Sequence, residues 1–196
     1  MAGSAPPVRR AHRFRRVRRV RQVVVMILAF VVCLWGWFAV TKIYLPRLDP
    51  LPADVDVLMQ VGGAKPEDVT AARHLAQDRA IADLVISVPT GVQSFRDAWC
   101  APLAGVRVHC FTPDPSTTRG EAQEFARLAQ RNNWTSAMVL ATGREHVERV
   151  RLYVTRCWDG DLSVNRPATS RSMVNHLKQA GYQTAGWGRA MKTRDC

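Results

Sequence analysis

The sequence predicts an α/β protein with a parallel sheet, preceded by one transmembrane helix. A long run near the N-terminus contains no charged residue. Beyond residue 55, short apolar runs alternate with segments of helical periodicity, an order typical of α/β folds. Three of these runs, "DVLMQV", "DLVISV" and "AMVLAT", lack polar alternation. This composition is expected of strands that helices cover on both faces of a sheet.

The charge-free run covers residues 23–40, "VVVMILAFVVCLWGWFAV". At about 1.5 Å per helical residue it spans most of a hydrocarbon core roughly 30 Å thick. Its Val, Ile, Leu and Phe side chains favour insertion by roughly 3 to 7 kcal/mol. We therefore predict a basic tail over residues 1–22 and a transmembrane helix over residues 23–44. A cleavable signal peptide is the alternative, but its apolar core is normally shorter, and no A-x-A-like site follows this run.

The charges before this run predict the orientation of the chain. The net charge is +12, and eight arginines with no acid among them precede Gln22, which leaves +4 for the rest. Arginines beside a transmembrane helix are retained on the cytoplasmic side, whereas Trp35, Trp37 and Tyr44 suit the opposite interface. We therefore predict a single-pass plasma-membrane protein with its N-terminus inside and its main domain extracytoplasmic. The arginines are a topology signal and a lipid contact, not a nucleic-acid-binding arm. They are Arg9, Arg10, Arg13, Arg15, Arg16, Arg18, Arg19 and Arg21.

Four of the five cysteines belong to the predicted outer part of the chain: Cys100, Cys110, Cys157 and Cys196. Disulfides persist in an oxidising space outside the cytoplasm. Four cysteines allow three pairings, and proximity in the sequence favours Cys100–Cys110, which leaves Cys157 for Cys196. The chain has no CxxC motif, and its histidines show no zinc-ligand spacing with the cysteines. No metal site is predicted.

Residues 45–54, "LPRLDPLPAD", contain three prolines, which predict an extended linker between the membrane and a domain over residues 55–196. Thr117 or Thr118 is the candidate N-cap of the helix that follows the third strand, with Glu121 in capping-box position to Thr118. The predicted strands of the domain are 55–61, 82–88, 106–112, 136–142 and 162–165. The predicted helices are 66–79, 92–99, 118–131, 145–157 and a terminal helix from residue 170 onward.

In an open parallel sheet, ligands bind at the carboxyl ends of the strands, where helix N-termini present free N–H groups. Gly62 and Gly63 follow the first strand and allow close approach of a ligand to the backbone, although paired glycines also form ordinary tight turns. Ser116, Thr117 and Thr118 follow the third strand. They either cap the next helix or bind an anion, since both roles use the same hydroxyl and N–H groups.

Thr142, His146 and Arg149 follow the fourth strand, within "TGREHVER". His146 and Arg149 are three residues apart and so share one helix face. Arg149 suits the binding of a phosphate or carboxylate, and His146 suits donating or shuttling a proton. The alternative is structural, because a single histidine is more often part of a core, and Glu121 or Glu145 can pair with Arg149.

The chain from about residue 55 onward resembles the DUF218 domain family, which includes the YdcF, SanA and ElyC proteins, and in particular its membrane-anchored actinobacterial branch. The motifs that carry the resemblance are "DVLMQVGGA", "PDPSTTRGEA", "VLATGREHVERV", "RCWDGDL" and "YQTAGWGRA". One departure is "SVPTG", which stands where the family has a Ser-Gly-Gly turn. Positions that match the family's pattern are Gly62, Gly63, Thr118, Glu121, Thr142, His146 and Arg149.

The resemblance implies a Rossmann-like three-layer α/β/α fold with about five mostly parallel strands, a polar pocket and paired outer cysteines. It also implies a role in the cell envelope, linked in the family to peptidoglycan and lipid-carrier homeostasis without a settled reaction.

The leading functional hypothesis is an outer domain that binds a phosphorylated or anionic envelope intermediate, for example one linked to a polyprenyl phosphate. Arg149 and the N–H groups at the Thr118 helix start hold the anion, Thr142 shapes the site, and His146 and Glu121 are the candidate catalytic residues. Whether the domain is an enzyme, and whether it uses a cofactor, stays open. The alternative is a non-catalytic scaffold or partner-binding module of the envelope. No nucleic-acid partner is expected.

Overall fold

The computed structural model describes residues 8–166, 176–192 and 196. The chain divides into two compact units, residues 1–40 and 41–196. The first contains the helix α1 (Val8–Ala39), after which a short π-helical turn, η1, covers Val40–Tyr44. Residues 17–44 form one helical stretch that is long and apolar enough to cross a membrane. Helix α1 begins at Val8 and therefore includes most of the predicted basic tail, residues 1–22.

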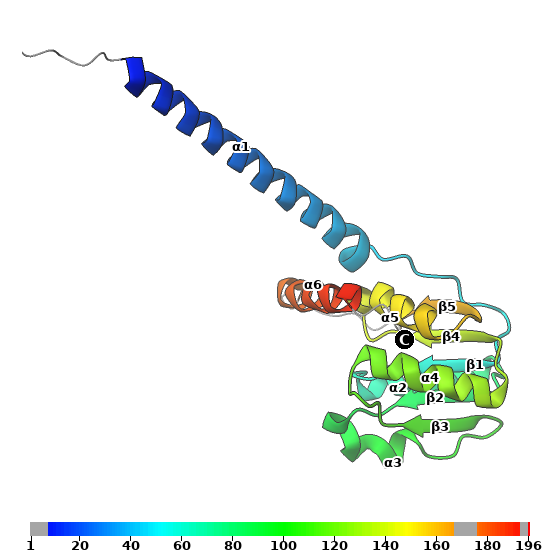
Figure 1. Cartoon of the computed structure of the whole chain (residues 1–196). Helices are drawn as coiled ribbons and strands as arrows, with labels where there is room; N and C mark the ends of the chain where they lie inside the picture. Colours follow the sequence, from blue (N-terminus) through cyan, green and yellow to red (C-terminus); the bar gives the residue numbers. More distant parts are fainter. Residues whose placement is uncertain (1–7, 167–175, 193–195) are drawn as a thin grey trace, which may run out of the picture. The chain divides into compact units, whose positions relative to one another are not determined.

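The second unit is built on one sheet of five strands that are all parallel, in the order β3-β2-β1-β4-β5 (Figure 1). This is the predicted fold class. The chain order reverses between β1 and β4, which is the position where open α/β sheets bind ligands. The strands are β1 (Val57–Gln60), β2 (Asp83–Ser87), β3 (Arg107–Phe111), β4 (Ser136–Leu140) and β5 (Asp161–Asn165).

The helices fall near their predicted positions, with one difference between β2 and β3. The predicted helix 92–99 is a 3₁₀ segment, η2 (Thr90–Phe95), followed by one short turn, α3 (Arg96–Trp99). The predicted terminal helix is described from His176, and its first residues, 170–175, lie outside the described part. The other helices are α2 (Pro66–Asp78), α4 (Thr118–Asn132), α5 (Arg144–Cys157) and α6 (His176–Lys192).

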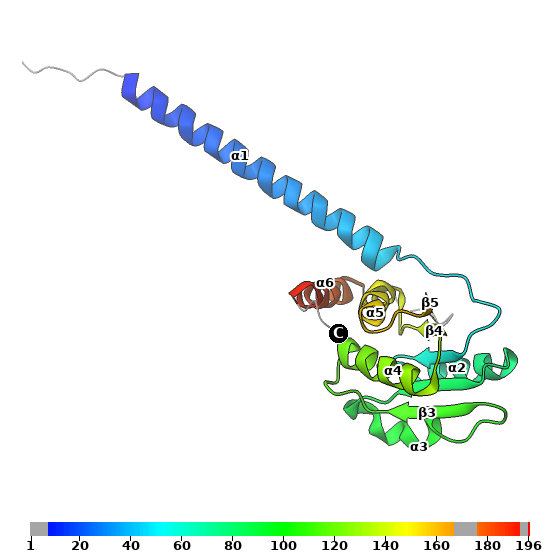
Figure 2. The same cartoon turned by 45° about the vertical axis from the view of Figure 1, so that its right-hand side comes forward.

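The sheet is buried between two layers of helices, and successive strand residues point to opposite layers. Val57 and Met59 belong to a core with Phe125 of α4, whereas Leu58 between them belongs to a second core with Val69 of α2. Figure 1 shows α4 and α2 on opposite sides of the sheet, and Figure 2 shows α6 beside α5. Both faces of the strands are therefore apolar, which explains their lack of polar alternation.

Part of the proline-rich linker packs on the α/β domain along β5. The Asp49 N–H donates to the carbonyl of Val164, and the Asp49 carboxylate accepts from the Val164 N–H at 2.9 Å. Arg151 of α5 pairs with the same carboxylate, and Glu148 accepts from the Arg47 N–H at 3.1 Å. The bonds of Asp49 satisfy the backbone groups of Val164 on the free edge of β5, and those of Arg151 and Glu148 connect the linker to α5. This is the helix that carries His146 and Arg149.

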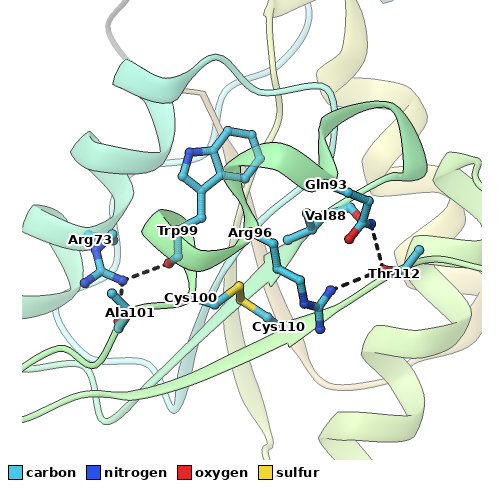
Figure 3. The surroundings of a disulfide bond; sticks show 9 residues. All are labelled: Arg73, Val88, Gln93, Arg96, Trp99, Cys100, Ala101, Cys110 and Thr112. Carbon is cyan, nitrogen blue, oxygen red and sulfur yellow. Dashed lines mark hydrogen bonds between the residues drawn. A yellow bond between two sulfur atoms is a disulfide. The ribbon is translucent and has the colours of Figure 1, made fainter.

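Two disulfides join the four cysteines of the α/β domain in the predicted pairing, Cys100–Cys110 and Cys157–Cys196. Figure 3 shows the first, which ties the end of α3 to the edge strand β3. Arg73 of α2 donates to the carbonyl oxygens of Trp99 and Ala101 at 2.8 and 2.9 Å beside it. The connection between β2 and β3, with only short helical segments, is thus anchored at the edge strand and at α2. Cys33 carries a free thiol.

Candidate functional site

A cavity of about 300 Å³ lies at the carboxyl ends of β1 and β4, where the strand order reverses. All nine residues predicted for catalysis or ligand binding line it. Its lining consists of Gly62, Gly63, Pro89, Pro113, Ser116, Thr117, Thr118, Glu121, Thr142, His146, Arg149, Tyr182 and Gln183.

One wall is the N-terminus of α4. Thr117 is the N-cap, and its hydroxyl accepts a hydrogen bond from the Gly120 N–H at 3.3 Å. A side chain at Gly120 would collide with the backbone of Pro115, so the loop before the helix folds closely against it. The predicted capping box with Thr118 is wrong, because Thr117 caps the helix and the Glu121 carboxylate is used elsewhere. The hydroxyl of Thr118 is therefore available to the site.

The Glu121 carboxylate connects α4 to the ends of β1 and β2. Its Oε1 accepts hydrogen bonds from the Gly62 N–H at 2.5 Å and from the Ser87 hydroxyl at 2.7 Å. A side chain at Gly62 would collide with Pro89 and with this carboxylate oxygen. Gly62 therefore allows a close approach of the backbone to the Glu121 carboxylate. The predicted approach of a ligand to this backbone stays a prediction.

His146 bridges the two helix starts that face the cavity. One ring nitrogen, Nε2, lies 3.0 Å from the Thr118 hydroxyl of α4, and Nδ1 lies 3.1 Å from the Thr142 hydroxyl. In a neutral imidazole one of these nitrogens donates and the other accepts. The ring and its two hydroxyls thus form a continuous path along which a proton can move between α4 and the end of β4.

Arg149 lies one helical turn beyond His146 and is only 7% exposed. Its guanidinium packs over the ring of Tyr182 in α6, with 5.4 Å between the guanidinium carbon and the ring centroid. A side chain at Gly186, one turn further along α6, would collide with the guanidinium. Nε of Arg149 is buried and has no hydrogen-bond partner among the described residues. The arginine therefore brings a donor to the cavity that the described protein atoms leave open.

Burial shifts the ionisation of both charged groups of the cavity. It raises the pKa of Glu121, although the Ser87 hydroxyl, the Gly62 N–H and the charge of Arg149 all favour its carboxylate. Burial also lowers the pKa of Arg149, against the attraction of Tyr182, Tyr153 and Glu121. An arginine stays protonated in proteins, so the cavity retains a positive charge. Of the two glutamates predicted as alternative partners, Glu121 attracts Arg149, but its closest partners are Ser87 and Gly62.

We expect Glu121→Gln to stabilise the protein at neutral pH but not at acidic pH. A carboxyl whose pKa is raised on folding makes its full contribution to stability below the pKa of the unfolded chain, near 4.5, and loses it as the pH rises through the folded value. Glutamine retains an oxygen that can accept from Gly62 and Ser87. Urea unfolding of the full-length protein in detergent micelles over a pH series measures the effect. The exposed Glu67→Gln is the control. A gain from Glu121→Gln that did not depend on pH would contradict the prediction.

Four lining residues were missing from every sequence prediction: Pro89, Pro113, Tyr182 and Gln183. Ser87, also outside the predicted site set, holds Glu121 in place. Tyr182 and Gln183 lie in the motif "YQTAGWGRA", which no local pattern connects to the cavity. Asp114 and Gly91, which also follow strand ends, are not among the lining residues. Within the described residues, no group of three or more His, Cys, Asp or Glu side chains is arranged to hold a metal ion.

Comparison with known protein families and with curated proteins finds no match for this chain. The likeness to the DUF218 family therefore stays a prediction from the motifs, and the geometry of the cavity supplies the argument for function.

Proposed function

We propose that this protein is a membrane-anchored envelope protein whose outer domain binds a phosphorylated or otherwise anionic envelope intermediate in the cavity between β1 and β4. The observation that carries the proposal is Arg149, a cation that is only 7% exposed and lines the cavity. Its Nε has no hydrogen-bond partner within the described part of the chain. Burying a charge is costly unless it is paired. A bound phosphate or carboxylate would supply the missing partner through charge-assisted hydrogen bonds.

The surrounding groups support the same ligand class. The first turns of α4 and α5 bring Thr118 and His146 to the cavity, and the N-terminus of a helix carries the positive end of its dipole. Burial raises the pKa of Glu121 and so disfavours its carboxylate, the form that would repel a bound anion. A volume of about 300 Å³ holds a small polar group. If the intermediate is linked to a polyprenyl phosphate, only its head group enters.

His146 is the candidate acid or base of the site. Its position between the hydroxyls of Thr118 and Thr142 allows a proton to pass to or from a ligand that contacts either hydroxyl. The assignment of the domain to the DUF218 family is part of the proposal and is supported by the motif likeness.

Ligands that remain bound during purification test the proposal. Native mass spectrometry of the full-length protein, extracted in mild detergent from its own membranes, should detect an anionic ligand on the wild type. His146→Ala should retain less of it, since Thr118 and Thr142 lose the ring that positions them. Arg144→Gln is the control, because Arg144 is exposed on the same helix and does not line the cavity. Wild-type protein without any anionic ligand, even after addition of an extract of the same membranes, would favour a non-catalytic scaffold.

We also propose that the N-terminus is cytoplasmic and the disulfide-bonded domain extracytoplasmic. A reporter that is active only outside the cytoplasm, fused to the C-terminus, should be active. Cys100 and Cys110 should resist maleimide labelling until a reductant is added, whereas Cys33 carries a free thiol and is the internal reference. Reporter activity confined to the cytoplasm, or free thiols at Cys100 and Cys110 in membrane-inserted protein, would contradict this orientation.

A further inference from the structure

The cavity contains a second open group, which differs in chemistry from Arg149. Gln183 of α6 lines the cavity and is only 3% exposed. Its amide oxygen, Oε1, is buried and has no hydrogen-bond partner among the described residues. Folded proteins rarely leave a buried acceptor unpaired, because the group has lost its water without replacement. A ligand that fills the cavity would supply the partner.

The partner of an amide oxygen must be a hydrogen-bond donor. A phosphate dianion or a carboxylate offers only acceptors, so the anionic group that Arg149 binds cannot also satisfy Gln183. Arg149 and Gln183 would therefore bind different parts of one ligand. Arg149 requires negative charge, and Gln183 requires an O–H or N–H group close to that charge.

Helix α6 brings these requirements together. Tyr182, which precedes Gln183, places its ring against the Arg149 guanidinium, and both Gln183 and Arg149 line the same cavity. The absence of a side chain at Gly186 leaves room for the guanidinium. The cavity volume of about 300 Å³ admits one small ring with its anionic group.

We propose that the ligand is a phosphorylated sugar or a related polyol, and that Gln183 is the specificity residue that accepts a hydrogen bond from a hydroxyl next to the phosphate. This inference rests on the proposed anion-binding function and deepens it. The same chemistry occurs in a free sugar phosphate and in the head group of a lipid that carries a sugar phosphate.

Two probes with the same charge separate the roles of Gln183 and Arg149. Methyl phosphate and glucose 1-phosphate are both dianions at pH 8, but only the second carries hydroxyl donors. Calorimetric titration of the full-length protein in detergent micelles gives both association constants. Wild type should bind glucose 1-phosphate about tenfold more tightly than methyl phosphate, and Gln183→Met should reduce that ratio to near one.

A second variant keeps the test decisive if Gln183→Met does not fold. In Gln183→Glu the carboxylate retains the acceptor but repels the phosphate. Both association constants should therefore fall, while their ratio stays at about ten. A wild-type ratio near one, or a ratio that Gln183→Met leaves unchanged, would overturn the inference and leave anion binding intact. Failure of wild type to bind either probe would contradict both proposals.

The source of the ligand is decided by a competition. Protein in phosphatidylcholine nanodiscs is compared with protein in nanodiscs that also contain phosphatidylinositol, whose head group is a phosphorylated polyol. Weaker binding of glucose 1-phosphate in the second case, absent when phosphatidic acid replaces phosphatidylinositol, supports a lipid head group as the ligand. Equal binding in all three supports a free sugar phosphate.

Discussion

Arg149→Gln should lower the affinity of the full-length protein for methyl phosphate by about 10- to 100-fold. A hydrogen bond to a charged group contributes about 1.5 to 3 kcal/mol, and each 1.4 kcal/mol corresponds to a factor of ten in affinity. Glutamine can still donate hydrogen bonds through its amide group, but the substitution removes the positive charge that attracts a phosphate. Calorimetric titration in detergent micelles at low salt measures the loss.

The matched control for this experiment is Arg144→Gln. It removes the same charge from the first turn of the same helix, but Arg144 is exposed and does not line the cavity. Its effect on affinity should stay within about twofold, since exposed charges act through screened, long-range attraction. Equal losses in the two variants would mean that the probe responds to overall charge, and the assignment of Arg149 would fail.

Stability separates a binding role of Arg149 from a structural one. Burial disfavours the charged guanidinium and outweighs its favourable contacts with Tyr182, Tyr153 and Glu121, which is why its pKa is lowered. Because burial of the charged guanidinium is unfavourable, Arg149→Gln should leave the unfolding midpoint in urea unchanged or raise it. Functional sites often accept lower stability in this way. A clear decrease in the midpoint would indicate that Arg149 mainly supports the packing of α6 on α5.

Asp83→Ala should reduce the free energy of unfolding by about 2 to 4 kcal/mol. The Asp83 carboxylate is buried at the start of β2 and accepts from Arg107 at 2.6 Å, from the Trp134 indole N–H at 3.1 Å, and lies 2.7 Å from His109 Nε2. Alanine would leave the indole N–H, which is buried with Trp134, without its acceptor. Arg107 is mostly exposed and would recover water, which limits the loss.

Acid should remove this contribution of Asp83. Burial alone would raise the pKa of Asp83, but the hydrogen bonds from Arg107, His109 and Trp134 outweigh it, and the pKa is lowered below its ordinary value of 3.8. The stabilisation is therefore present above the pKa of the unfolded chain and is lost as the pH falls through the folded value. Urea unfolding between pH 7 and pH 3 should show the wild type approaching the variant at the acidic end.

The exposed Asp54→Ala, which removes the same charge, is the control for both measurements. A stability difference between wild type and Asp83→Ala that stayed constant down to pH 3 would show that the loss comes from packing and not from the charge.

Glu121→Gln should stabilise the protein at neutral pH, whereas Asp83→Ala should destabilise it. This difference reflects the surroundings of the two carboxylates at opposite ends of the sheet. At the amino end of β2, the Asp83 carboxylate has three polar partners, Arg107, His109 and Trp134. At the carboxyl end, Glu121 has two neutral donors and burial prevails. Ionisable groups whose pKa is shifted by burial toward the uncharged form are more typical of functional sites. The cavity between β1 and β4 fits that description, and the Asp83 cluster does not.

Local patterns in the sequence were sufficient for the elements and for most of the cavity. Strands covered on both faces lack the polar alternation of half-exposed strands, so the apolar run within "DLVISV" predicts β2 without any knowledge of its neighbours. Because parallel strands all end at one edge of the sheet, the residues after β1, β3 and β4 were expected to meet, and Gly62, Thr118 and His146 do. Likewise, hydropathy alone identifies the helical stretch that can cross a membrane, since insertion depends on the segment's own side chains.

Only the tertiary structure determined which strands are neighbours, where Glu121 directs its carboxylate, and that α6 closes the cavity with Tyr182 and Gln183. Each depends on contacts between segments far apart in the chain. Such contacts produce no recognisable pattern in the sequence of either segment. The capping box failed for this reason: the local pattern at Thr118 was satisfactory, but Gly62 and Ser87 offered the Glu121 carboxylate two donors from distant strands. The open acceptor of Gln183 likewise becomes visible only once α6 is packed beside Arg149, since an amide in a helical sequence is ordinarily solvated.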